Sequence, residues 1–405
     1  MEGLTKAQRG LLMAAILFVA LNLRPALAAI GPMTEQILLV TALGSTGIGL
    51  LTTLPVILMG VGAMAVRPLR RLLGEKLGIG VGILIIAVSC AGRAWLSTEP
   101  GLLATSAGAG IGISVVQALA PGFIKRNFAA NTGGAIGLFS TGIVVGAALA
   151  AAGTARLSEG FGWAGALACW ALPALLAACL WVPASRPAKE ETQDHADVTA
   201  NKQTRPFSHA LRSWSLLVFF GLGTGVFLLV IAWLPPFYVE LGQTERTAGD
   251  LLAMLTGVEA LTALGLAALI HHFPDRRGPL VTCLLLVLAG LACLLVSPIP
   301  LAIPAVILLG CGIGILFPLS IIVAIDHIDD PTAAGNFTAF VQGGGYIVAS
   351  IIPLAAGALR DRFSSLGPAW LLMAVGIAGL IILATRYSPN SYLAFRRAAS
   401  SVGAK

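Results

Sequence analysis

One arginine, Arg24, lies deep inside the first apolar run of the chain, residues 11–31. This run is long enough to cross a hydrocarbon core about 30 Å thick, and Arg24 lies about 5 Å from its middle. A guanidinium at that depth costs from about 3 to more than 10 kcal/mol unless water or a partner reaches it. Because it offers planar, bidentate donors, we predict that Arg24 binds an anionic or strongly dipolar solute. The alternative is a structural arginine, satisfied by carbonyls or paired with Glu259.

Glu259 is the acidic residue that lies near the centre of a predicted span, and three interpretations of it stay open. In a dry site without a partner, the carboxylate readily takes up a proton and acts as a proton carrier. If it pairs with Arg24, both groups stay charged and the substrate competes with the glutamate. In a wet site it stays ionised and has no coupling role.

Three amide side chains at membrane depth, Asn22, Gln117 and Gln342, are further candidate substrate ligands. Asn22 is two residues from Arg24, so the two cannot share one face of a regular helix. The alternative for each amide is a hydrogen bond between helices.

Trp233 and Tyr238 flank the pair Pro235 and Pro236 near the outer end of the seventh apolar run. We predict that the aromatic rings contact substrate and that the two prolines break the helix, so that its tip bends as an outer gate. An aromatic belt at the membrane interface is the ordinary alternative.

Lys125, Arg126 and Asp326 lie at the inner ends of the fourth and tenth apolar runs, about 200 residues apart. We predict that Lys125 or Arg126 pairs with Asp326 when an inner gate closes. The alternative is solvated loop charges that contribute at most about 1 kcal/mol.

Composition places the chain in a membrane. Of its 405 residues, 57% are hydrophobic and 11% are charged, whereas soluble domains carry about 25% charged residues. The cysteines and histidines lack metal-ligand spacing, and the Gly-x-Gly runs lie inside apolar spans without a phosphate-loop context. No basic run is interleaved with aromatics. We therefore expect no cofactor, metal, nucleic-acid partner or enzymatic activity.

Twelve apolar runs have spanning length, and we expect each to form a helix. They lie at residues 11–31, 46–66, 77–97, 101–123, 133–154, 163–183, 214–238, 247–270, 279–297, 301–325, 333–357 and 367–385.

The polar stretch 185–213 divides these runs six and six. We predict a six-helix bundle at 1–184, a cytoplasmic linker at 185–213 and a second bundle with a short cytoplasmic tail at 214–405. With the N-terminus inside, 19 of the 25 Lys and Arg residues fall in inner segments, which predicts that both termini are cytoplasmic. The outer segments and their flanks then hold Arg93, Arg156, Arg246, Arg360 and Arg362.

The two halves resemble each other. The run Gly108–Ile113, read GAGIGI, recurs as GCGIGI at Gly310–Ile315, and the pattern Leu50-Leu51-x-x-Leu54 recurs about 200 residues later. An even number of spans in each repeat implies parallel repeats about an axis along the membrane normal, with substrate held between them. The predicted fold is an all-α membrane protein of twelve helices in two pseudo-symmetric six-helix bundles.

Several stretches resemble the major facilitator superfamily and its cyanate permease branch, which also includes a 2-nitroimidazole exporter. They are Leu21-Asn22-Leu23-Arg24-Pro25 with Gly31-Pro32, Leu50-Leu51-Thr52-Thr53-Leu54-Pro55, Gln117 to Pro121 with Ile124-Lys125-Arg126, and Ile231-Ala232-Trp233-Leu234-Pro235 with Phe237-Tyr238. The resemblance covers most of the chain. It implies that spans one, four, seven and ten line the cavity, which favours Gln117 over Gln342.

Two features depart from the family pattern. The loop between spans two and three usually reads Gly-x-x-x-Asp-Arg-x-Gly-Arg-Arg. Here residues 70–76 keep the glycine but lack the acid, whereas the second copy, 275–278, is closer. An interhelical charge latch is therefore expected in the second half rather than in the first. Glu259 stands where the branch pattern has an uncharged amide.

These observations predict a secondary transporter in which two bundles rock around a small central site. The resemblance implies a cyanate-like anion or a nitroimidazole-like heterocycle, and protons are a candidate coupling ion. We expect a monomer in the lipid bilayer of a bacterial inner membrane. Alternatives are a broad-specificity drug efflux pump and a passive channel or facilitator. A membrane enzyme and a receptor have less support, since no catalytic constellation or signalling module is present.

Overall fold

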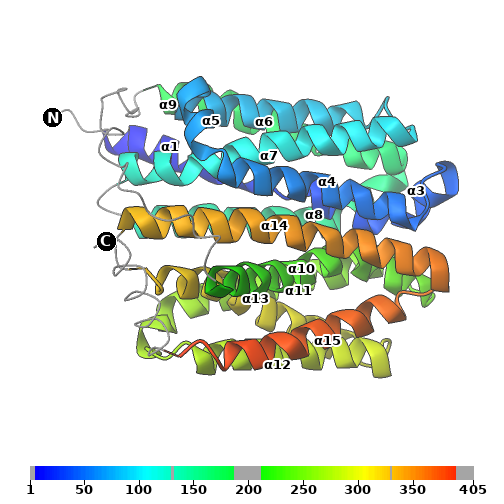
Figure 1. Cartoon of the computed structure of the whole chain (residues 1–405). Helices are drawn as coiled ribbons and strands as arrows, with labels where there is room; N and C mark the ends of the chain where they lie inside the picture. The colour runs from blue at the N-terminus through cyan, green and yellow to red at the C-terminus, as the bar shows by residue number, and fades with distance from the viewer. Residues whose placement is uncertain (1–4, 129–131, 187–210, 329–330, 389–405) are drawn as a thin grey trace.

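The computed structural model describes residues 5–128, 132–186, 211–328 and 331–388, and every regular element in these ranges is helical (Figure 1). This confirms the predicted all-α class. Most of the predicted linker and the end of the tail lie outside the described residues. The elements are α1 (Lys6–Leu21), α2 (Pro25–Ala28), η1 (Gly31–Met33), α3 (Thr34–Val40), α4 (Ser45–Met64), α5 (Val66–Leu73), α6 (Glu75–Gly92), α7 (Glu99–Asn127), α8 (Thr132–Cys169), α9 (Ala171–Ser185), α10 (Leu211–Glu240), α11 (Glu245–Leu269), η5 (Ile270–His272), α12 (Arg277–Val296), α13 (Ala302–Ile325), α14 (Pro331–Phe363) and α15 (Gly367–Ala384).

Within the described residues, eleven helical stretches are long and apolar enough to cross a membrane. The longest, Gly134–Ser185, has 52 residues, which is more than twice the roughly 20 that one crossing needs. Gly162 divides it, because its φ of 67° and ψ of 172° are not helical, and a positive φ of this kind suits glycine. The fifth span therefore ends before Gly162 and the sixth follows it, which brings the spans to the predicted twelve.

The first span is not the unbroken helix that its apolar pattern predicts. α1 ends at Leu21, and the four-residue helix α2 begins at Pro25. Proline has no N–H to donate to the carbonyl of Leu21, and its ring clashes with the preceding turn, so the helix stops before it. Arg24 lies in the resulting break.

The helices form two groups that lie against each other, α1–α9 above and α10–α15 below in Figure 1. Between the groups, α4 packs along α14 and α8 packs along α11. We call the end of the molecule where α1 begins and α15 ends the proximal end (left in Figure 1), and the end where α4 begins the distal end.

Glycines allow α4 and α14 to approach closely. A Cβ atom added to Gly60 would lie 2.7 Å from the carbonyl oxygen of Gly343, and one added to Gly49 would lie 2.7 Å from the carbonyl oxygen of Pro353. Such contacts leave no room for a side chain. Small residues at a helix interface permit close packing in a membrane.

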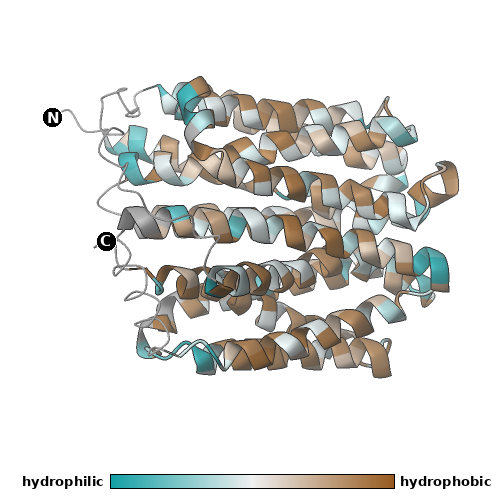
Figure 2. Ribbon diagram, viewed as in Figure 1, coloured by the Kyte–Doolittle hydropathy of each residue, from teal (hydrophilic) through white to brown (hydrophobic). Residues whose placement is uncertain are grey.

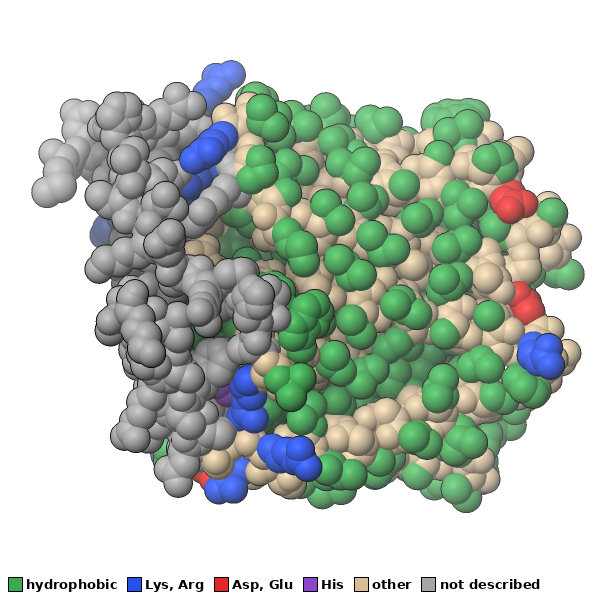
Figure 3. All heavy atoms as spheres, in the orientation of Figure 1, with side chains coloured by type: hydrophobic (Ala, Val, Ile, Leu, Met, Phe, Trp, Pro, Cys, Tyr) green, Lys and Arg blue, Asp and Glu red, His purple; other side chains and the backbone are tan. Residues whose placement is uncertain are grey.

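The outside of the molecule is apolar along most of its length, and charged side chains gather at its two ends (Figures 2 and 3). Large hydrophobic side chains on α9 and α15 are well exposed, among them Leu172 at 64% and Val375 at 63%. A soluble monomer rarely exposes extended apolar surface, so these faces match contact with lipid tails.

Candidate functional site

Arg24 lies at the break between α1 and α2, directly before the first residue of α2. The residue is 7% exposed, and its guanidinium carbon lies 5.3 Å from the centre of the Phe227 ring on α10. Among the described residues it forms no hydrogen bond and no ion pair, yet its nitrogen atoms keep some accessible surface. The guanidinium therefore reaches across to the second group of helices with its donors uncommitted.

Glu259 faces the same region from α11. The residue is 9% exposed, and its Oε2 atom is buried without a hydrogen-bond partner. It interacts electrostatically with Arg24 across the boundary between the two groups, but the two side chains form no ion pair within the described structure. A close Arg24–Glu259 pair, one of the three interpretations above, is not formed in this conformation.

A cavity of about 600 Å³ lies between the two groups in the proximal half of the molecule. Its walls come from α4, α5, α7 and α8 on one side and from α13 and α14 on the other. Gln117 and Gln342 both face it, so the structure places the two predicted glutamines together. The lining residues are Met59, Ala63, Val66, Ser114, Gln117, Ala118, Pro121, Phe139, Ile143, Ile325, Ala334, Thr338, Ala339, Gln342 and Tyr346.

Tyr346 connects this cavity with Arg24. Its ring lines the cavity, lies edge-on to Phe220 with centroids 5.4 Å apart, and interacts electrostatically with Arg24. Sequence reasoning did not single out Tyr346. Its position four residues after Gln342 on the same helix could have revealed it, because residues spaced by four share a helical face.

Asn22 supports the break in the first span. The residue is 2% exposed, and its amide nitrogen donates to the carbonyl of Phe18 at 2.8 Å and to that of Pro173 at 3.1 Å. Both amide hydrogens are thus committed to backbone, one within α1 and one on α9. This is the helix-to-helix arrangement that sequence reasoning had kept as the alternative to substrate contact.

Trp233 and Tyr238 are fully buried, and each donates a hydrogen bond to backbone. The indole N–H of Trp233 donates to a carbonyl of α14 at 3.0 Å, and the Tyr238 hydroxyl donates to a carbonyl after α12 at 3.2 Å. α10 continues as a helix through Pro235 and Pro236 to Glu240. The expected break at these prolines is therefore wrong for this conformation.

At the distal end, Arg360 of α14 links the two groups of helices. Its NH2 donates to Glu35 of α3 at 2.6 Å, and its Nε donates to Glu240 of α10 at 2.8 Å. The guanidinium also lies over the Trp233 ring, 5.7 Å from its centre. From the distribution of positive charge, sequence reasoning had counted Arg360 among the outer residues, but it had not identified these partners.

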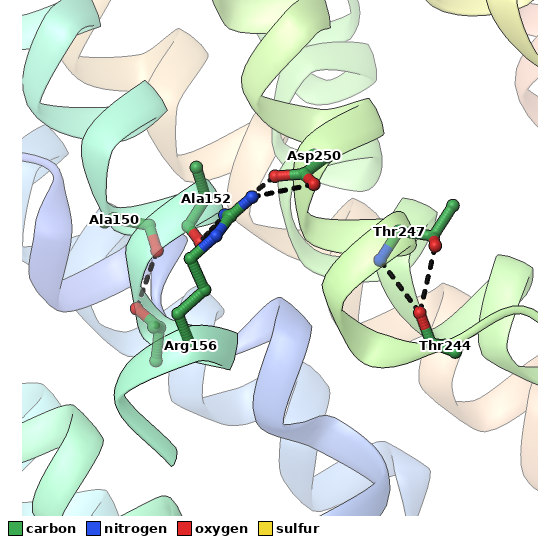
Figure 4. A network of polar contacts seen from close by, with 7 residues as sticks. Ala150, Ala152, Arg156, Thr244, Thr247 and Asp250 are labelled. Atoms are coloured by element: carbon green, nitrogen blue, oxygen red, sulfur yellow. Dashed lines mark hydrogen bonds and ion pairs between the residues drawn. The ribbon is translucent and has the colours of Figure 1, made fainter. Parts of the chain in front are cut away.

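Two further contacts close the distal end. The carboxylate of Asp361 accepts the backbone N–H groups of Ser45 and Thr46, at 2.9 Å each, where α4 begins. A carboxylate at a helix N-terminus is favoured by the helix dipole. Arg156 of α8 pairs with Asp250 of α11 at 2.8 Å (Figure 4). Both the Asp361 contact and the Arg156 contact join the first group of helices to the second.

At the proximal end, two ion pairs between described residues each lie within one group. Glu75 at the start of α6 pairs with Arg126 near the end of α7, and Arg276 before α12 pairs with Asp326 after α13 at 3.0 Å. The two pairs occupy corresponding places in the two repeats, with the charges reversed. The second pair matches the predicted latch in the second half. The first shows that Glu75 supplies an acid that the departure from the loop pattern had led us not to expect. Beside the second pair, hydrogen bonds from the side chain of Arg277 lower the pKa of Asp275.

Arg93 was also expected to lie at an outer flank, and the structure buries it instead. The residue is 1% exposed, and it donates to the carbonyl of Ala26 at 3.0 Å and to the Ser106 hydroxyl at 3.2 Å. The sequence contained one signal: Arg93 follows the apolar run of α6 directly, without an acidic neighbour.

Twelve spanning helices in two six-helix groups, with Arg24 and a cavity between the groups, are the features of a membrane transporter. The chain belongs to the Major Facilitator Superfamily, whose sequence profile matches residues 11–353.

Two relatives from Escherichia coli (strain K12) match nearly the whole chain. The cyanate transport protein CynX is 34% identical, over 92% of this chain and 96% of the relative. The 2-nitroimidazole transporter is 29% identical, over 94% and 95%. Among solved structures, a D-xylose-proton symporter matches 95% of this chain and 98% of its own, with a TM-score of 0.77 at 13% identity. A bacterial homologue of the lysosomal transporter Spinster covers 98% of both chains, with a TM-score of 0.71 at 17% identity. The last two likenesses establish the fold alone.

Proposed function

We propose that this chain is a secondary transporter that carries a small anionic or strongly dipolar solute by alternating access, with Arg24 as the substrate-binding cation. The observation that carries the proposal is a guanidinium between the two groups of helices that has no hydrogen-bond or ion-pair partner among the described residues. A buried cation with free donors favours a ligand that supplies negative charge. The names of the two relatives support cyanate-like anions and nitroimidazole-like heterocycles as the substrate class.

The distal contacts and the proximal cavity suit a state that is closed at one end and hollow at the other. We propose that the proximal end faces the cytoplasm of a bacterium, with both termini inside, and that the protein acts as a monomer in the inner membrane. Substrate would reach Arg24 along the cavity past Gln117, Gln342 and Tyr346. Asn22, Trp233 and Tyr238 would support the site by packing without contacting substrate through their donors, because those donors bind backbone carbonyls.

We propose Glu259 as the proton carrier. Its buried Oε2 atom has no donor to stabilise the ionised form, and Arg24 is the cation with which it interacts. Proton uptake by Glu259 would leave the positive charge of Arg24 uncompensated and so favour binding of an anion. Anion binding and protonation would thereby assist each other, which is the thermodynamic basis of symport.

Closure of the proximal end would bring the two intragroup ion pairs together. Arg126, with Lys125 beside it, would then face Asp326, and Glu75 would face Arg276. Exchange of partners would convert two pairs within groups into two pairs between groups. At the distal end, the tip of α10 around Pro235 and Pro236 would move when Arg360 is released.

Uptake into proteoliposomes tests the role of Arg24. Cyanate and 2-nitroimidazole serve as probes for wild type, Arg24→Ala and Arg24→Lys, and Arg246→Ala is the control because Arg246 is an exposed distal arginine. Loss of a charge-assisted hydrogen bond should lower uptake of at least one probe about 10- to 100-fold in Arg24→Ala. Arg24→Lys should retain part of the activity. Equal uptake by wild type and Arg24→Ala would rule out the assigned role.

Counterflow with the same vesicles tests coupling. Glu259→Gln, which cannot ionise, should keep exchange of labelled for unlabelled probe and lose accumulation driven by a proton gradient. Full gradient-driven accumulation by this variant would remove Glu259 as the carrier. A passive facilitator would show no accelerated exchange in wild type.

A second candidate, export of amphiphilic organic compounds, has one observation in its favour. The cavity of about 600 Å³ is larger than a triatomic anion needs, and Met59, Phe139, Ile143 and Ile325 make much of its wall apolar. Under this alternative, lipophilic compounds would be transported equally well by wild type and by Arg24→Ala.

A further inference from the structure

The buried guanidinium of Arg93 contacts the broken segment that carries Arg24 through a hydrogen bond. Arg93 ends α6 near the distal end, and its side chain points into the protein instead of out to water. It donates from NH1 to the carbonyl of Ala26 at 3.0 Å and from NH2 to the hydroxyl of Ser106 on α7 at 3.2 Å. Long basic side chains at helix ends normally reach outward to the interface. The inward direction therefore indicates that specific acceptors hold it.

The carbonyl of Ala26, which Arg93 binds, receives no backbone N–H donor in this short helix. In a regular helix, the N–H of Ile30 would donate to Ala26, four residues earlier. Here the N–H of Ile30 donates to Leu27 at 3.2 Å instead, and that of Ala29 donates to Pro25. The Arg93 guanidinium takes the place of the missing backbone donor. A buried carbonyl without a donor costs free energy, so the break is supported by a side chain from another helix.

We propose that Arg93 is a positioning residue that fixes the backbone of Pro25–Ala28 and thereby aims Arg24 between the two groups of helices. Without its donor, the segment can recover the regular Ile30-to-Ala26 bond by rewinding. Successive residues on a helix point about 100° apart, so a change of winding two residues from Arg24 turns the guanidinium away from Phe227. The proposal rests on the proposed function, in which Arg24 binds the substrate.

The chemistry suits an arginine in particular. One planar group must donate in two directions at once, to a carbonyl on α2 and to a hydroxyl on α7. Lysine offers a single point of donation at the end of a flexible stem, so it can serve one of these acceptors well but not both. Arg93 forms no ion pair among the described residues, and both of its hydrogen-bond acceptors are neutral.

The test compares Arg93→Met, which keeps most of the volume and removes every donor, with Arg93→Lys, Ser106→Ala and the exposed control Arg246→Met. Cyanate and 2-nitroimidazole uptake is measured as KM and maximal rate, and the melting temperature of each purified variant is recorded. Arg93→Met should raise KM for the transported probe about 10- to 100-fold, with the maximal rate largely kept. Arg93→Lys should recover part of the loss, and Ser106→Ala should change KM by less than about threefold. An unchanged KM in Arg93→Met overturns the proposal.

A second measurement does not depend on the substrate. In a background without native cysteines, Arg24→Cys is labelled with a charged thiosulfonate reagent, with and without Arg93→Met. The labelling rate should change severalfold if Arg93 sets the direction of residue 24. An equal rate at equal melting temperature contradicts the proposal, even if wild type transports neither probe. Failure of both probes together with a changed labelling rate would count against the proposed substrate class and in favour of the role of Arg93.

Discussion

Replacing Glu35 with glutamine should release the distal end of the molecule. Arg360 holds two carboxylates at once, Glu35 at 2.6 Å and Glu240 at 2.8 Å. Glu240 lies on α10, in the same group of helices as Arg360, whereas Glu35 lies on α3 in the other group. Glu35→Gln therefore removes the charged contact of Arg360 with the first group and leaves its contact within the second group intact.

The expected size of the effect follows from burial. The Arg360 side chain is 9% exposed and that of Glu35 is 29% exposed. A hydrogen bond between charged groups contributes about 1.5–3 kcal/mol, and partial exposure of the glutamate reduces this to about 1–2 kcal/mol. A difference of that size shifts an equilibrium about 5- to 30-fold. Glu35→Gln should raise the ratio of distal-open to distal-closed molecules by this factor.

Pulsed electron paramagnetic resonance in lipid nanodiscs measures the change directly. Spin labels at Leu39 on α3, which is 85% exposed, and at Arg246, an exposed residue on α11, report the separation of the two groups. Wild type should show mainly the short distance, and Glu35→Gln should add a longer one. Glu240→Gln is the matched control. It removes an equal charge from the same guanidinium but keeps the contact with Glu35, so its distances should match wild type.

Two outcomes would refute this reasoning. If Glu35→Gln gives the wild-type distance distribution, the contact contributes nothing to closure. If Glu240→Gln opens the distal end as far as Glu35→Gln does, general loss of charge around Arg360 is responsible rather than the link between the groups.

Three further predictions use the same preparations. Asp361→Asn should open the distal end about fivefold, because the neutral amide loses the favourable interaction with the start of α4; the same label pair measures it. Gly60→Val should lower the melting temperature and the uptake rate, since its Cβ would meet a carbonyl at 2.7 Å, whereas Gly376→Val, with nothing within 4 Å, should not. Asp326→Arg should slow uptake, and adding Arg126→Glu should restore part of it if these residues pair during proximal closure; no recovery in the double variant would exclude the exchange of partners.

The twelve spans and their division into two groups were predictable because hydrocarbon imposes one rule on every segment. Each crossing needs about 20 apolar residues in a helix, and that pattern is local. The break in the first span was not predicted, although Pro25 marks it. The apolar run continues across the proline, and hydropathy does not report backbone geometry. The glycine at position 162 separates two spans whose boundary hydropathy had already placed correctly.

Their position within the predicted spans was enough to select candidate polar residues, but the hydrogen-bond and ion-pair partners of those residues could not be predicted. Asn22, Trp233 and Tyr238 were selected as polar or aromatic groups at membrane depth, and each donates to a carbonyl of a distant segment. Arg93 and Arg360 were counted only as outer charges, and both are buried. Such pairings depend on which helices are neighbours in space, and one sequence contains no direct record of that.

The arrangement of charge at the two ends suits the proposed alternation between two closed ends. At the distal end the contacts of Arg360, Asp361 and Arg156 join the groups. At the proximal end Glu75–Arg126 and Arg276–Asp326 stay within them. If the two repeats carried charges of the same sign at these places, closure would bring like charges together. Because the signs are reversed, the proposed exchange of partners would let each base meet an acid across the pseudo-symmetry axis, so the proximal end would close without loss of ion pairs. Two states that lie within a few kcal/mol of each other are what a ligand with modest differential affinity can interconvert.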